Sequence, residues 1–77
     1  MANPLRLFEH SGVTYATGLF ALHDTHGFSL ADSIIECNRR GWYPCVEQFF
    51  YDALKAGWSR DKARQVVDGA RADAAVV

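Results

Sequence analysis

The sequence predicts a mainly α domain, a small bundle of three to four short helices to which an N-terminal β-hairpin is added. Two observations predict this class. Glycine and proline fall between segments whose apolar side chains recur at the period of an α-helix. Hydrophobic residues make up 49% of the 77 residues, enough for one compact core. We therefore expect a single small helical domain over residues 1–77.

The start of the chain favours a β-hairpin. Residues 5–9 and 13–17 flank the turn-forming sequence His10-Ser-Gly12, and the second segment is rich in β-branched and aromatic residues. An alternative stays open here, because Asn3 followed by Pro4 could instead cap a short helix.

Two helices are predicted next, over residues 17–26 and 30–40. The first ends at Gly27 and the second at Gly41. Ser29, with an acid three positions later, has the spacing of a capping box and predicts the start of the second helix. The apolar positions of that helix recur on one face: Leu30, Ile34 and Cys37.

Two further helices are predicted over residues 44–56 and 60–72. Pro44 suits a first-turn position, because its missing N–H would have no partner there. Gly57 suits a left-handed stop, and Ser59 can cap the last helix. The apolar faces are Val46, Phe49, Phe50, Ala53 and Leu54 in the first, and Ala63, Val66, Val67, Ala70 and Ala74 in the second. Short turns favour an antiparallel helical hairpin plus a third packing helix.

The charge balance excludes broad classes of partner. Eight basic and nine acidic side chains leave a net charge of -1, which gives no general attraction to nucleic acid or anionic lipid. No apolar run approaches the roughly 20 residues of a membrane span, and the first residues lack an export signal. We expect a cytoplasmic protein without a membrane partner, in which both cysteines are free thiols.

Metal binding is the second alternative function. His23 and His26 could face one side of a helix, and Cys37 and Cys45 could complete a four-ligand zinc site. The spacing argues against it, because structural zinc sites use close cysteine pairs. His23-Asp24 lacks the further histidines and acids of a metal-dependent hydrolase, and neither cysteine has a basic, exposed setting. We expect no cofactor, no metal ligands and no catalytic residues.

Nucleic-acid binding is the first alternative. The helices over 44–56 and 60–72, joined by a short turn, are typical of a helix-turn-helix. The last helix presents Arg60, Arg64 and Gln65, side chains of the types that read bases in DNA or tRNA. Three aspartates are interleaved with them, so attraction to phosphate would be weak.

Aromatic side chains predict a protein-binding surface. Trp42 and Tyr43 lie at a helix end, and Tyr51 lies on a polar helical stripe. Asp24 and His26, at the end of another helix, complete the five candidate binding residues. We expect a non-enzymatic binding module, a regulator or inhibitor that contacts a larger cellular machine through protein–protein interaction, as a monomer or small homo-oligomer.

One tract also resembles a family signature. Phe20-x-Leu22-x-Asp24-Thr25-x-Gly27-Phe28 is similar to a motif of alanyl-tRNA synthetases, which typically show Phe-x-Leu-Tyr-Asp-Thr-Tyr-Gly-Phe-Pro followed by a helix. The resemblance covers about residues 20–49. It implies a helix, turn, helix arrangement near tRNA-recognition elements, as in the region after the catalytic core of that family. It does not imply aminoacylation, since histidines replace the two tyrosines, Ser29 replaces the proline, and the chain has no room for the ATP-binding core.

Overall fold

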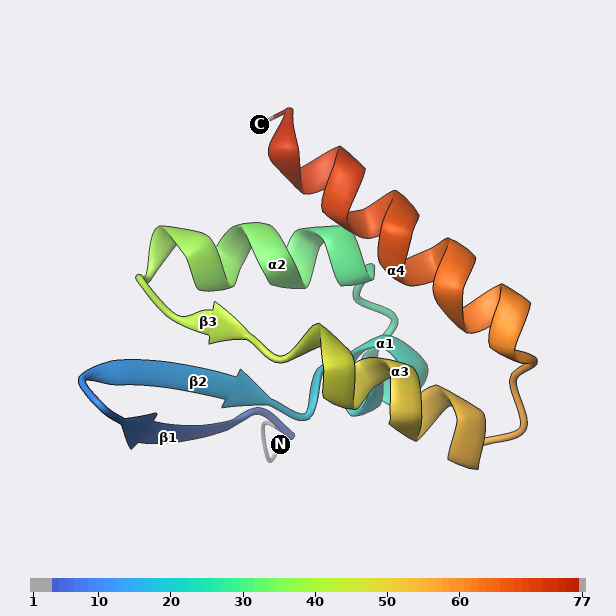
Figure 1. Ribbon diagram of the computed structural model, residues 1–77, viewed down its shortest axis with the longest axis horizontal. Coiled ribbons are helices and arrows are strands. Elements are labelled where there is room, and N and C mark those ends of the chain that lie inside the picture. The colour runs from blue at the N-terminus through green and yellow to red at the C-terminus, as the bar shows by residue number, and fades with distance from the viewer. Residues whose placement is uncertain (1–3, 77) are drawn as a thin grey trace.

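The computed structural model describes residues 4–76 and shows four helices that pack on one another, with a small sheet at one side of them (Figure 1). The elements are β1 (Arg6–His10), β2 (Val13–Thr17), α1 (Leu19–His26), α2 (Leu30–Arg39), β3 (Tyr43–Pro44), α3 (Val46–Lys55) and α4 (Arg60–Ala75). The mainly α class and the N-terminal hairpin are confirmed. The third strand means that the domain is not purely a helical bundle.

The sheet has β2 at its centre. β2 pairs with β1 in antiparallel orientation and with β3 in parallel orientation. The hairpin turns at Ser11 and Gly12, both with positive φ, which is the backbone shape that two-residue hairpin turns require. The alternative of a short helix near Pro4 is wrong, because Pro4 and Leu5 lie outside any helix and lead into β1; Asn3 lies outside the described residues.

The predicted helix over residues 44–56 needs a correction. It starts at Val46, and Pro44 belongs to β3, opposite Ala16 of β2. A short edge strand tolerates proline, because the missing N–H removes no essential hydrogen bond there. The next residue makes the bond instead: the Cys45 N–H donates to the Ala16 carbonyl at 2.9 Å.

Other helix boundaries shift by a few residues. α4 runs three residues past the predicted 72, through an alanine-rich segment of high helix propensity. α1 begins at Leu19, two residues after the predicted start, because Gly18 has a left-handed backbone. α2 ends at Arg39, one residue early. The caps predicted at Ser29 and Ser59 are confirmed, since each hydroxyl accepts a backbone N–H at 3.1 Å.

α2 and α3 end in the same way, with a left-handed glycine followed by a tryptophan. The Trp42 N–H donates to the Cys37 carbonyl at 2.8 Å, and the Trp58 N–H donates to the Ala53 carbonyl at 3.0 Å. This motif satisfies carbonyls at the helix ends and turns each tryptophan back toward the core. The two Gly-Trp pairs of the sequence are therefore helix stops that also supply large apolar side chains.

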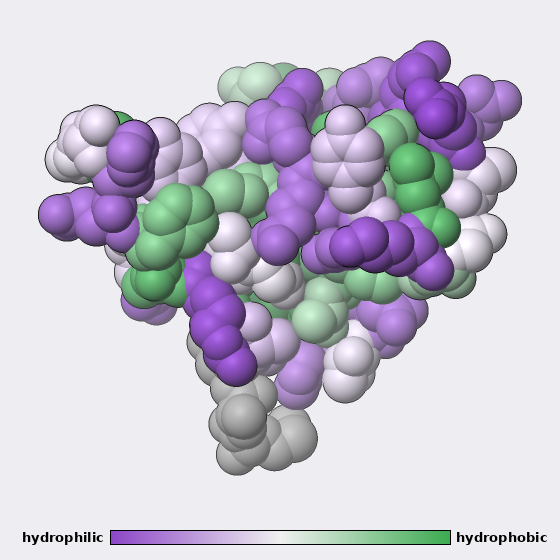
Figure 2. Space-filling model, turned by 60° about the horizontal axis from the view of Figure 1, so that its bottom comes forward, coloured by the Kyte–Doolittle hydropathy of each residue, from purple (hydrophilic) through white to green (hydrophobic). Residues whose placement is uncertain are grey.

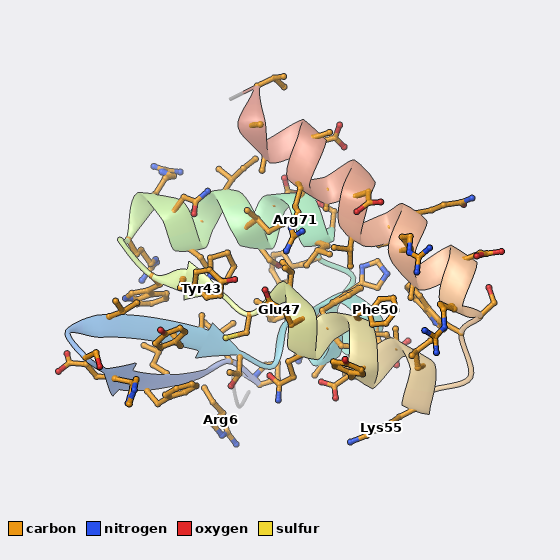
Figure 3. The ribbon with its side chains drawn as sticks, in the orientation of Figure 1. Arg6, Tyr43, Glu47, Phe50, Lys55 and Arg71 are labelled. Carbon is orange, nitrogen blue, oxygen red and sulfur yellow. The ribbon has the colours of Figure 1, made fainter. Side chains whose placement is uncertain are left out.

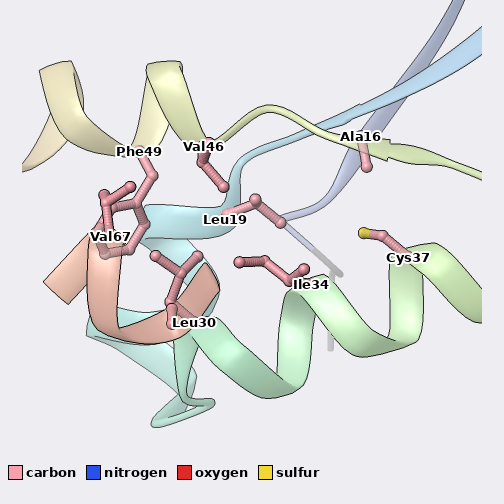
Figure 4. Close-up of a cluster of buried hydrophobic side chains, with 9 residues drawn as sticks. Ala16, Leu19, Leu30, Ile34, Cys37, Val46, Phe49 and Val67 are labelled. Atoms are coloured by element: carbon pink, nitrogen blue, oxygen red, sulfur yellow. The ribbon is translucent and has the colours of Figure 1, made fainter. Parts of the chain in front are cut away.

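The core contains buried side chains from β2 and from all four helices (Figure 4). Its largest fully buried side chains are Leu19 and Phe49, each 1% exposed. The other buried members are Ala16, Leu30, Ile34, Cys37, Val46, Val67 and Ala70. α4 covers this core by packing more extensively on α2 than on α3.

Candidate functional site

A groove along α2 is the candidate binding site, and we call it the α2 groove. It has a volume of about 700 Å³ and lies between α2, the end of α1 and the segment that leads into β1. Its apolar lining comes from Pro4, Leu5, Leu22, Phe28, Ile35 and Trp42. Its charged and polar side chains are His26, Asp32, Glu36, Arg39 and Arg40. An apolar recess with a few polar groups around it is typical of a binding site.

Phe28 owes its position to the turn between α1 and α2. Gly27 has a φ of +74° and ends α1, and the next N–H, that of Phe28, donates to the Leu22 carbonyl at 3.3 Å. The Phe28 carbonyl lies 3.1 Å from Nδ1 of His23. A carbonyl can only accept, so the hydrogen bond requires the proton on Nδ1. The turn leaves Phe28 54% exposed on the wall of the groove.

At one end of the groove, the side chains of Arg39 and Arg40 make only weak contacts with their neighbours. Glu36 lies 3.8 Å from Arg39 and 3.5 Å from Arg40, and all three side chains are about half exposed or more. The Arg40 guanidinium also lies 5.2 Å from the centroid of the Trp42 ring. Exposed ion pairs of this kind contribute at most about 1 kcal/mol. Both arginines can therefore exchange Glu36 for a carboxylate of a partner.

The five predicted binding residues do not form one surface. His26 and Trp42 line the α2 groove. Tyr51 is 62% exposed and borders a smaller recess between α3 and α4. Asp24 is exposed on α1 and lines neither of these two recesses.

Tyr43 belongs to a polar chain that joins the sheet to α3 and α4. Its hydroxyl donates to Oε2 of Glu47 at 2.7 Å, and Nη2 of Arg71 lies 3.7 Å from the same oxygen (Figure 3). The hydrogen bond to the Glu47 carboxylate raises the pKa of the Tyr43 phenol, with burial adding to the effect. Tyr43 therefore helps to position α3 and α4, and its hydroxyl already has a partner.

Sequence reasoning missed Phe28 as a site residue. Asp24 and His26, at the end of the helix before it, were predicted as binding residues instead. A usable signal was present: Phe28 stands between a glycine stop and a serine cap, so it belongs to the buried face of neither helix.

The residues of the nucleic-acid alternative lie at the start of α4. Arg60, Arg64 and Gln65 are all exposed. Arg64 borders the recess between α3 and α4 together with Asp68, and Arg71 further along is paired with Glu47. Arg71 is thus paired with a carboxylate, whereas the Lys62 ammonium lies 4.2 Å from the centroid of the Trp58 ring.

The candidate metal ligands are not brought together. Among residues 4–76, no three His, Cys, Asp or Glu side chains lie close enough to hold a metal ion. The His23 ring packs on Phe49 and Trp58, with centroids 5.7 Å apart in both cases. Cys37 is buried in the core. His23 and Cys37 therefore serve packing, and His23 also makes a local hydrogen bond.

Both cysteines are free thiols, as expected. Burial raises the pKa of the Cys37 thiol, and the nearby Cys45 and Glu36 raise it further while Arg40 lowers it. Burial also raises the pKa of the Cys45 thiol, with Glu47 adding to the effect. The thiolate is the reactive form, so these pKa directions describe two poorly reactive thiols.

We expect the thiols to impose a pH dependence on stability. A raised pKa in the fold means that the neutral thiol is favoured, so this contribution is present below the ordinary thiol pKa of about 8.5 and is lost as the pH rises through the raised pKa. Urea unfolding should show lower stability at about pH 10 than at about pH 7. The free energy of unfolding of the Cys37→Ala variant should fall less between these two pH values. An equal fall in both proteins would show that the Cys37 thiol is not the cause of the pH dependence.

In comparisons with known proteins, no family model, no curated protein and no solved structure matches the chain. The helix, turn, helix arrangement implied by the resemblance to alanyl-tRNA synthetases is present in α1 and α2. The relationship itself stays a prediction. Among the described residues, no helix has both the length and the apolar character needed to cross a membrane.

Proposed function

We propose that this protein is a non-enzymatic binding module that takes a segment of a partner protein into the α2 groove. Phe28 carries the proposal: a phenylalanine with 54% of its surface exposed stands on the wall of an apolar recess. Exposing such a side chain to water is unfavourable, and burying its exposed half against a partner recovers about half of the roughly 1.5–3 kcal/mol that full burial of a phenylalanine contributes.

The surroundings of Phe28 favour a protein partner. Trp42 and Ile35 continue the apolar lining, and charged side chains stand along its border. An apolar, partly aromatic centre within a polar rim is the usual composition of a protein–protein interface. Tryptophan and arginine are also the side chains that most often dominate binding energy.

The charges of the groove indicate what the partner segment carries. Arg39 and Arg40 lie at the end of α2, whereas Asp32 lies in its first turn. A segment with an apolar side chain between Phe28 and Trp42 and a carboxylate at the arginine end would match this pattern. A small chain that binds in this way acts by occupying a surface of its partner. A regulator or inhibitor of a larger cellular machine, working in the cytoplasm, is the role we propose.

Truncation of Phe28 should disrupt partner capture. We expect Phe28→Ala to weaken binding at least about tenfold, because a buried aromatic anchor contributes 1.4 kcal/mol or more. The measurement is a pull-down from the native host with mass spectrometry, followed by calorimetry with the partner that is identified. Circular dichroism checks that the variant is folded, which is expected because Phe28 is more than half exposed.

Tyr51→Ala is the matched control for that experiment. Tyr51 is also an exposed aromatic residue, but it borders the other recess. Capture should survive this substitution. If Phe28→Ala and the native protein captured the partner equally well, the α2 groove would be excluded as the binding site. If only Tyr51→Ala lost the partner, the binding site would instead be the recess between α3 and α4.

The nucleic-acid alternative has one supporting observation, the exposure of Arg60, Arg64 and Gln65 on α4. A nuclease-treated sample in the same pull-down separates the two classes of partner. Binding to nucleic acid would weaken steeply with salt and fail when Arg60 and Arg64 are changed to glutamate. Capture that is insensitive to nuclease and salt supports the protein partner instead.

A further inference from the structure

The α2 groove follows one helix along its whole length. Its lining includes Phe28, just before α2, and Trp42, just beyond it, with Ile35 between them along the chain. The ten residues of α2 rise about 15 Å along the helix axis. The groove is therefore an elongated apolar strip with an aromatic side chain toward each end of α2.

The exposed apolar side chains of the hairpin are divided between the two faces of the sheet. Leu7 lies on one face, and Phe8 and Val13 lie on the other. Figure 2 shows hydrophobic side chains among hydrophilic ones at this end of the molecule. Of these two surfaces, the α2 groove is therefore the one that suits a continuous apolar stripe.

The backbone around the groove restricts the conformation of a bound segment. Among the described residues 4–76, those that line the groove lie in α1, in α2 or between elements, and none lies in a strand. The N–H groups of Phe28 and Trp42 already donate to carbonyls of α1 and α2. An extended segment would find no strand to pair with here, so its burial would leave polar backbone groups without partners. An α-helix satisfies its own backbone groups, except at its ends.

The charges along the groove select the direction of such a helix. Asp32 lies in the first turn of α2, whereas Arg39 and Arg40 lie at its end, where Glu36 offsets one of their two charges. A helix antiparallel to α2 places its own first turn beside the arginines and its last turn beside Asp32. The helix dipole favours acidic side chains in the first turn and basic ones in the last, which is also the pattern that the groove attracts. A parallel helix would need the reverse pattern, against its own dipole.

We propose that the α2 groove takes an amphipathic α-helix of the partner protein, antiparallel to α2. The proposal rests on the function proposed above and adds the conformation, the direction and the side-chain pattern of the bound segment. Apolar side chains at positions i, i+4 and i+7 span about 10 Å and face the strip between Phe28 and Trp42. Acidic side chains in the first turn lie beside Arg39 and Arg40. A helix of about 10–12 residues matches the length of α2.

Selection from a peptide library tests the conformation. Random peptides of about 16 residues, long enough for a helix of this length, are displayed on phage and selected on the native chain. The enriched sequences should share three apolar positions at the proposed spacing and an acid in the first turn. A synthetic peptide of the most enriched sequence should gain helix on binding, measured by circular dichroism as the complex minus the sum of its components.

The two tryptophans of the chain test the direction. Trp42 lines the groove at the arginine end, whereas Trp58 is not part of its lining. A nitroxide on the first residue of the peptide should broaden the NMR signal of the Trp42 indole N–H more than that of Trp58. A nitroxide on the last residue should broaden the Trp42 signal less. The opposite order of the two labels would overturn the antiparallel direction.

Charge reversal tests the side-chain pattern. The double variant Arg39→Glu, Arg40→Glu should bind the peptide at least about fivefold more weakly, because two attractions become repulsions. Replacing the first-turn acids of the peptide by lysine should restore binding to this variant. Arg60→Glu is the matched control, since Arg60 is an exposed arginine outside the groove, and it should leave binding unchanged. An equal loss with Arg60→Glu, or no recovery with the lysine peptide, would overturn the proposed pattern.

Phe28→Ala separates failure of this inference from failure of the proposed function. Enriched peptides that lose binding to Phe28→Ala but carry no helical pattern, or gain no helix on binding, would overturn the helical occupant and keep the α2 groove as the site. Enriched peptides that bind Phe28→Ala as tightly as the native protein would overturn both. A library that yields no enriched sequence would also overturn both.

Discussion

Replacing Phe49 by alanine should destabilise the domain by about 3–5 kcal/mol. The side chain is 1% exposed and, with Leu19, is among the largest that are fully buried. The centroid of its ring lies 5.4 Å from that of Phe20, 5.7 Å from that of His23 and 5.9 Å from that of Trp58. The substitution therefore removes buried surface and leaves a cavity between α1, α3 and the Trp58 ring.

The small size of the chain makes this loss severe. Stability typically amounts to about 0.05–0.15 kcal/mol per residue, or roughly 4–12 kcal/mol for a chain of this length. A loss of about 3–5 kcal/mol removes a large part of it. Urea unfolding followed by circular dichroism measures the effect. Tyr51→Ala is the control on the same helix: its side chain is 62% exposed, so its loss should stay within about 0.5 kcal/mol. Similar losses for both variants would contradict the assigned core.

The predictions that depended on local signals were the accurate ones. Ser29 and Ser59 cap helices where the sequence placed them, and glycines end α2 and α3. A cap or a stop depends on the preference of one or two residues for a backbone shape, so it can be read without knowing the fold. The hairpin was predictable for the same reason, since Gly12 adopts positive φ at no steric cost.

The errors concern contacts between distant segments. Pro44 was read as a helix start because its preference fits that position, but pairing of β3 with β2 decided its place. The spacing of cysteines and histidines likewise gave no sign that His23 packs on Phe49 and Trp58. The α2 groove depends on residues from the N-terminal segment, α1 and α2 meeting in space. A local sequence pattern cannot predict that these three segments lie next to one another in the fold.

Gly18 is the second position where a small change should have a large effect. It joins β2 to α1 with a φ of +86°, and its carbonyl accepts the Leu22 N–H at 3.2 Å. A Cβ at this position would collide with the backbone carbonyl of Pro4, which cannot move as a side chain can. A left-handed backbone costs a residue other than glycine about 1–2 kcal/mol, and the collision adds to that cost. We expect Gly18→Ala to destabilise the protein by at least about 2 kcal/mol.

Gly69→Ala supplies a matched control with the opposite sign. Gly69 lies inside α4, and a Cβ there would meet no atom within 4 Å. Alanine is a better helix former than glycine, so this variant should gain about 0.5–1 kcal/mol. Thermal unfolding of both variants and of the native protein measures these two changes in stability, which should have opposite signs. If Gly18→Ala unfolded at the native temperature, then the close approach of Pro4 to the start of α1 would be wrong, and with it one wall of the α2 groove.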